Sequence, residues 1–280
     1  MTLSEFEAER MQQIHQWLNE LESRQEAPGD LLQRYDLFLD ELFALLPDEM
    51  QKRILENLDQ CFIYVQVALH QVEHVHDKVE KMIANVKVMN SEIDDLSGMK
   101  SLPLEKLQLL AEREINMHQL YSLVQGGLAG SGNPLLLGID LPAVILINLK
   151  AIQSIALSYG YPIHHPVEAI LALKVFHSAT LPKRFQRKAW DRLFQELRDQ
   201  DGYFYEGNNR ISDVPWFNTL LLQLMKAVAI HLFRNKETKK GSFFSVAIGA
   251  GSNYVLTKQV TDWAHRFYQY RFLLDKNDYE

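Results

Sequence analysis

An apolar residue recurs at every seventh position over a long segment of this chain, and no other feature constrains the fold as strongly. One series runs from Leu58 to Ile93, and a second, three residues later, runs from Cys61 to Leu96. Such spacings place the apolar residues on one face of an α-helix that packs against other helices. The repeat predicts a long helix over Asp48–Leu96. Additional apolar residues widen its face, which favours packing within one bundle over the alternative of an intermolecular coiled coil; these are Phe62, Leu69 and Ile83.

Helical periodicity continues along almost all of the 280 residues, and no alternating pattern is long enough to indicate a sheet. We therefore predict an all-α protein. A single domain, a multi-helix bundle, is expected to span residues 1–280, with residues 1–44 as an N-terminal helical extension. In this bundle the heptad-patterned helix forms the spine. The composition, 47% hydrophobic and 23% charged, is ordinary for a globular protein.

Charge and cysteine content exclude several classes of function. The net charge is −7, which disfavours nucleic-acid binding because affinity for phosphate depends on Lys and Arg. Cys61 is the sole cysteine of the sequence, so neither an intrachain disulfide nor a cysteine-rich metal site can form. The N-terminal segment carries acidic residues where a signal peptide needs a basic region. These features predict a cytoplasmic location.

The segment 126–173 is apolar and rich in glycine, yet it contains Asp140, Lys150 and Glu168. A membrane-spanning helix needs about 20 mostly apolar residues. Asp or Lys near the centre of such a helix costs about 2.5–3.5 kcal/mol, and each Leu, Ile or Val offsets only about 0.3–0.6 kcal/mol. For residues 135–157 the balance is close to zero. We favour a central apolar helical hairpin inside the bundle, and a membrane-inserted hairpin is the alternative.

Several motifs in this order and spacing resemble the EcsC family of bacterial proteins. The resemblance spans Leu45 to Leu274, and one departure from it is Pro162, where an acidic residue is more typical. It implies an all-α, apolar protein linked to the membrane, and it implies no activity, cofactor or catalytic residue. The motifs are the glycines Gly126, Gly130 and Gly132, then Asp140-Leu141-Pro142, Ile155-Ala156, Tyr159-Gly160-Tyr161, Pro166, Glu168, and near the C-terminus Gly249, Gly251, Asn253 and Tyr254.

Charged residues in an apolar segment are costly unless they are paired, so they often mark a binding site. We take Asp140, Lys150 and Glu168 as candidate ligand-binding residues. The family motifs add Tyr159, Tyr161 and Asn253 as candidate neighbours. The alternative is that Asp140 caps a helix, Glu168 lies in a favourable first turn, and Lys150 extends to solvent.

The sequence HQVEH, residues 70–74, matches the H-x-x-E-H pattern of a zinc-protease family. Helical spacing places His70, Glu73, His74 and Asp77 on one side. That side lies opposite the apolar seam, where a solvated face is expected, and no third ligand follows in the usual arrangement. We therefore predict no metal site.

The segment 181–197 predicts a basic amphipathic helix with aromatic residues on its apolar side. Such helices often lie on anionic membranes. The alternative is a helix that packs its aromatic residues on the core and solvates its charges. The candidate membrane-contact residues are Lys183, Arg184, Arg187, Lys188 and Trp190, together with Lys239 and Lys240 in a basic loop.

No phosphate-binding loop, nucleophile elbow or Cys-x-x-Cys pair occurs in the sequence. We expect a non-enzymatic helical protein without a cofactor, peripheral to the inner face of the cytoplasmic membrane. Its partner would be an anionic membrane surface or a membrane protein complex such as a transporter. One alternative is a soluble scaffold that binds a protein through the long helix. The third is a metal-dependent hydrolase that uses HQVEH.

Overall fold

The computed structural model describes residues 3–23, 31–56, 58, 60–63, 65, 72–128, 137–163, 165–199, 215–237 and 245–278. Every regular element within these residues is helical, which confirms the all-α prediction. The elements are α1 (Glu5–Glu22), α2 (Leu31–Ala44), α3 (Asp48–Glu56), α5 (Val72–Met89), the 3-10 turn η1 (Gly98–Ser101), α6 (Leu104–Leu128), α7 (Leu137–Ser158), α8 (Pro166–Thr180), α9 (Lys183–Asp199), α10 (Pro215–Glu237) and α11 (Ser245–Asp278).

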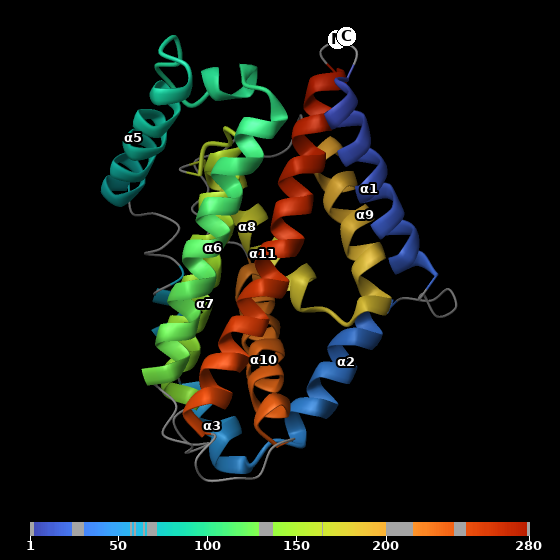
Figure 1. Ribbon diagram of the computed structural model, residues 1–280. Helices are drawn as coiled ribbons and strands as arrows, with labels where there is room; N and C mark the ends of the chain where they lie inside the picture. Colours follow the sequence, from blue (N-terminus) through green and yellow to red (C-terminus); the bar gives the residue numbers. More distant parts are fainter. Residues whose placement is uncertain are drawn as a thin grey trace.

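Helix α11 occupies the centre of the bundle (Figure 1). Its most extensive contact is with α6, and α7, α8 and α10 also pack against it. Helices α1 and α9 lie side by side and cover another side of α11. The heptad pattern predicts the spine in residues 48–96, but α11 holds that position, and α5 lies at the periphery beside α7.

The predicted helix over Asp48–Leu96 does not continue to Leu96. Helix α5 ends at Met89. The side-chain oxygen of Asn90 accepts a hydrogen bond from the backbone N–H of Glu92 at 3.1 Å. This local bond lets Asn turn the chain in place of another helical turn. The predicted helix therefore stops seven residues early.

The apolar seam of the heptad segment is nevertheless directed inward. At the seam positions whose side chains are described, most residues are buried, and Leu58, Val79 and Leu96 are partly buried. This pattern supports packing within the chain. The buried seam residues are Cys61, Val65, Met82, Val86 and Ile93, each 5% exposed or less.

Helices α7 and α8 form the predicted central apolar hairpin. Within α7, the window Leu141–Ser158 has a mean hydropathy of 1.6 and is long enough to cross a membrane. In the folded protein 78% of that window is buried against other helices. A core helix of a bundle has the same composition, so the burial of α7 favours the hairpin inside the bundle.

A tight turn joins α7 to α8 and fixes the residues that follow. Gly160 adopts a left-handed conformation with φ of 78°. The N–H of Tyr161 then donates to the carbonyl of Ala156 at 3.0 Å, which closes the end of α7. Helix α8 begins with Pro166, and the ring of His165 accepts from the N–H of Val167 at 3.3 Å.

We expect Gly160→Ala to destabilise the protein by about 1–2 kcal/mol, because the left-handed conformation is costly for a residue with a Cβ atom. That atom would also lie 3.1 Å from the carbonyl oxygen of Leu96. Urea denaturation measures the cost. The control is Gly98→Ala, where φ is ordinary and the closest atoms belong to the side chains of Asp95 and Ile93. An equal cost in both variants would contradict the argument.

Candidate functional site

The structure brings Tyr161 and Glu168 together at the start of α8, where both contact Arg271 of α11. Glu168 is 5% exposed, and its Oε1 accepts a hydrogen bond from Nη1 of Arg271 at 2.7 Å. The guanidinium carbon of Arg271 lies 4.0 Å from the centroid of the Tyr161 ring. A buried carboxylate needs such a cation, since an isolated buried charge is very costly.

A second ion pair lies next to this one. The phenol of Tyr161 donates to Oδ2 of Asp275 at 2.9 Å, and the ammonium of Lys100 contacts the same oxygen at 2.9 Å. Tyr161 therefore connects the pair Glu168–Arg271 with the pair Lys100–Asp275. We call Lys100, Tyr161, Glu168, Arg271 and Asp275 the Arg271 network.

Two buried oxygen atoms, one in the network and one beside it, have no hydrogen-bond partner among the described residues. Neither Oε2 of Glu168 nor the hydroxyl of Tyr268 makes a hydrogen bond to any described residue. The Tyr268 ring lies 5.6 Å from the Tyr161 ring, measured between centroids. Orphaned buried polar atoms are uncommon in folded proteins and often occur at sites that bind something.

The ionisation states of the network suit binding. Burial raises the pKa of Tyr161 and of Tyr268 well above the usual phenol value, so both remain protonated donors. Burial opposes the charge of Arg271, but Glu168 and the two phenols together raise its pKa above the ordinary value. Arg271 thus supplies a permanent cation, and Tyr268 beside the network supplies a phenol donor; both are groups that recognise an anion.

Tyr159 lies in a separate contact on the other side of the turn. Its side chain is completely buried, and its hydroxyl lies 2.8 Å from Nε2 of His265. Burial lowers the pKa of His265 to about 4, so its neutral ring can accept the phenol proton. The hydroxyl of Tyr159 thus already has a hydrogen-bond partner, and Tyr159 stabilises the junction of α7 with α11.

Lys150 lies in a different part of α7. It is exposed, as expected from the alternative in which its side chain extends to solvent. Close to it, the hydroxyl of Ser154 contacts Lys78 and lies 3.0 Å from Nε2 of His118. A Ser with a Lys and a His can form a nucleophilic centre. Here Ser154 is fully buried and donates its proton to the backbone carbonyl of Lys150 at 2.7 Å, so it is a satisfied core group.

Asp140 and Asn253 do not join the Arg271 network. Asp140 lies within the first turn of α7 rather than at the capping position before it, and its side chain lies outside the described set. Its backbone is about 27 Å along the axis from Ser158, since a helix rises 1.5 Å per residue. Asn253 is buried in α11 but about 27 Å along that helix from Arg271. The structure therefore does not bring all six predicted ligand residues together in the Arg271 network.

The basic helix α9 packs its aromatic face on the core, as the alternative interpretation expects. Trp190 is 2% exposed and contacts the rings of Trp17, Phe194 and Trp263. Trp190 therefore cannot contact a membrane surface in this fold, and that part of the prediction is wrong. The physical reason is that α1 and α11 already cover the apolar side of the helix.

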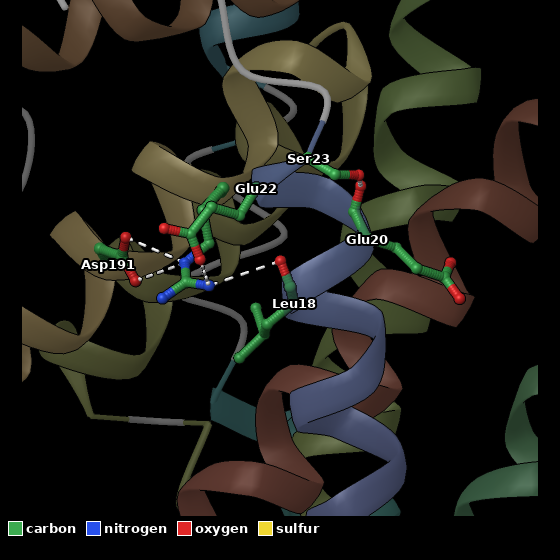
Figure 2. Close-up of polar contacts among 6 residues, drawn as sticks. Leu18, Glu20, Glu22, Ser23 and Asp191 are labelled. Atoms are coloured by element: carbon green, nitrogen blue, oxygen red, sulfur yellow. Dashed lines mark hydrogen bonds and ion pairs between the residues drawn. The ribbon is translucent and has the colours of Figure 1, made fainter.

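Arg187 is also directed toward the protein. Its guanidinium donates to both carboxylate oxygens of Asp191 at 3.1 Å, and to Glu22 and the carbonyl of Leu18 on α1 (Figure 2). These bonds tie α9 to α1. Lys183 is exposed, Arg184 and Lys188 are partly exposed, and Lys239 and Lys240 lie outside the described residues.

The side chains of the HQVEH segment, residues 70–74, also lie outside the described set. Asp77 and His76 are exposed, and His76 pairs with Glu80 at 3.1 Å. Among the residues that the structure describes, no group of three His, Cys, Asp or Glu side chains could hold a metal ion. The described part of the chain thus gives no support to the hydrolase alternative.

Sequence reasoning missed Arg271, Asp275 and Lys100. A weak signal was available for Arg271, since it is a lone cation within the aromatic run from Phe267 to Leu273. A charge at such a position needs a partner. The identity of that partner depends on the contact between α8 and α11, which the local pattern does not encode.

Comparisons with known proteins agree with the family resemblance that the sequence motifs indicate. The chain is similar to the uncharacterized protein YdbA of Bacillus subtilis (strain 168), with 25% identity over 278 residues and 96% of each chain covered. No solved structure matches significantly. The model of the EcsC protein family matches residues 8–273, which includes α2 and most of α1. Since this match covers nearly the whole chain, the protein belongs to the EcsC family.

Proposed function

We propose that this protein acts without catalysis at the inner face of the cytoplasmic membrane and binds anionic lipid through the outer face of α9. The observation that carries the proposal is the orientation of α9. Its aromatic side is buried against the core of the protein. Its basic side chains other than Arg187 therefore lie on the outer side of the helix, at the protein surface. Contact with a membrane would be electrostatic and would not require insertion.

Local charge supports this assignment. Helix α9 contains six basic and three acidic residues, whereas the whole chain has a net charge of −7. Arg187 is committed to α1, and Arg192 pairs with Glu196 at 3.0 Å. The proposed lipid-contact residues of α9 are Lys183, which is exposed, and Arg184 and Lys188, which are partly exposed. From the sequence alone, Lys239 and Lys240 are proposed to extend the contact.

Flotation with lipid vesicles tests the proposal. We expect the protein to float with phosphatidylcholine vesicles that contain phosphatidylglycerol, and the bound fraction to fall at 1 M salt, where the Debye length is about 3 Å. Each basic residue near such a surface contributes about 1 kcal/mol. Reversing Lys183, Arg184 and Lys188 to Glu should thus weaken binding by about 3 kcal/mol or more, which is about a hundredfold or more.

A matched variant separates a local effect from a general change in charge. Lys52, Lys81 and Lys87 are exposed on α3 and α5, and their replacement by Glu changes the net charge equally. We expect this control to float like the unmodified protein. Equal loss in both variants would contradict the role of α9. Absence of flotation at every lipid composition would reject membrane binding.

The runner-up function is a scaffold that binds a protein partner through the heptad segment. It is favoured by exposed apolar side chains there, namely Leu55 at 49%, Ile63 at 59% and Val88 at 88% exposure. Apolar residues at the surface can mark protein contacts when they form a patch. Charge reversal on α9 would leave such a contact unchanged. A protein partner that still binds the charge-reversed variant would therefore favour the scaffold.

A further inference from the structure

A cleft of about 870 Å³ lies between α1, α9 and α11, adjacent to the Arg271 network. Small-molecule sites commonly have volumes of about 300–1,000 Å³ and combine an apolar wall with a few polar groups. The apolar part of this wall is formed by Leu18, Trp190, Phe194, Leu197, Tyr270 and Leu274. Arg271 and Asp275 line the same cleft, so the network forms one of its walls.

The arginine side chains of the cleft have unused N–H donors among the described residues. Arg271 carries five N–H groups. Among the described residues it makes one hydrogen bond, to Glu168, although its side chain is only 17% exposed. Arg198, which also lines the cleft, donates from Nε to the carbonyl of Phe194 at 3.3 Å and to no other described group.

Both acidic side chains that line the cleft already pair with cations. Both oxygens of Asp191 accept from Arg187, and Asp275 accepts from Lys100 and Tyr161. A cation would therefore compete with ion pairs that exist, whereas an anion would meet free donors on Arg271. The hydrogen-bonding groups thus select an anionic ligand.

The type of anion follows from geometry and charge. The planar fork of a guanidinium matches a carboxylate, which it can bind through two parallel hydrogen bonds. Glu168 and Asp275 flank Arg271, and their charges would repel a dianionic phosphate more strongly than a monoanion. The aromatic and aliphatic wall is suited to an apolar body attached to that carboxylate.

We propose that the cleft between α1, α9 and α11 binds an amphipathic monocarboxylate, such as a fatty acid, with its carboxylate on Arg271 and its chain along Trp190 and Phe194. This site is distinct from the outer face of α9. It requires no membrane, so it can be tested in the absence of vesicles and independently of the flotation result.

The test is titration calorimetry of the whole protein with dodecanoate below its micelle concentration. We expect saturable binding of one dodecanoate. Dodecanol lacks the charge and acetate lacks the chain, so each should bind at least tenfold more weakly. Absence of saturable dodecanoate binding would overturn the proposal. Equal binding of dodecanol would reject the role of the cation, and tighter binding of dodecyl phosphate would reject the assignment of a carboxylate.

Substitutions test whether the ligand binds in the cleft. Arg271→Lys keeps the charge beside Glu168 but loses the fork, and it should weaken dodecanoate binding at least tenfold without unfolding the protein. Leu197→Trp fills the cleft and should remove binding. The matched control is Val255→Trp, because Val255 lines a different cleft of about 790 Å³. Equal loss from both Trp variants, or full affinity in Arg271→Lys, would overturn the proposed site.

Discussion

Between pH 7 and pH 5 the free energy of unfolding is expected to fall by about 6 kcal/mol, because three buried histidines remain neutral in the folded protein and become protonated on unfolding. Burial is the main cause in each case. It lowers the pKa of His118 to about 3, and the pKa values of His177 and His265 to about 4. The nearby cations Lys78 and Lys150 lower the pKa of His118 further.

The sign follows from proton binding in the two states. An unfolded histidine has a pKa of about 6.5 and takes up a proton as the pH falls below that value. The folded protein resists protonation until about pH 4, so acid favours the unfolded state throughout this window. Each histidine contributes about 2 kcal/mol at pH 5. Because domains are stable by only about 5–15 kcal/mol, much of the total is lost.

Urea denaturation at a series of pH values measures this effect. Replacing His118, His177 or His265 by Gln should reduce the pH dependence by about a third in each case, on the same linkage argument. His76→Gln is the control, because this side chain is 72% exposed and is hydrated in both states. A stability that does not change between pH 7 and pH 5 would contradict the burial of these rings.

Arg271→Met is expected to destabilise the protein by about 3–5 kcal/mol, because it leaves the carboxylate of Glu168 buried without its cation. Glu168 is 5% exposed, so water cannot replace the lost partner. Restoring neutrality should recover most of the loss. The double variant Arg271→Met with Glu168→Gln should therefore be more stable than Arg271→Met alone.

An exposed ion pair on the same helix provides the control. Lys258 and Asp262 are 51% and 39% exposed, and such pairs contribute about 0–1 kcal/mol. Lys258→Met should thus have little effect on the urea midpoint. If Glu168→Gln did not restore stability to Arg271→Met, the ion pair would not be the source of the loss.

The sequence was sufficient for the helical class and for one half of the site. Glu168 was identifiable because it is a charged residue in an apolar segment, and Tyr161 because it lies in a family motif. These are local signals that act over a few residues. The other half, Arg271 and Asp275, lies more than a hundred residues later, at a contact set by the packing of α11.

The errors have a common physical origin. Asp140 was grouped with Glu168 because both are charges in one apolar segment, and Asn253 was added because it lies in a family motif. Neither signal gives the position of a residue along a helix many turns long. Trp190 was assigned to a membrane because an amphipathic helix looks the same whether its apolar side meets lipid or protein. The heptad pattern continued past Met89, but the side chain of Asn90 offered the backbone an alternative bond.

The central position of α11 has a consequence for synthesis of the protein. Domains generally form as the chain leaves the ribosome, from the N-terminus onward. Here α6, α7, α8 and α10 all pack against a helix that is made after them. The faces that they direct to α11 therefore stay uncovered until α11 emerges, and Lys276 then reaches Glu7 of α1 at 2.6 Å. Ribosome-bound chains that lack α11 would be the form of this protein that most needs a chaperone.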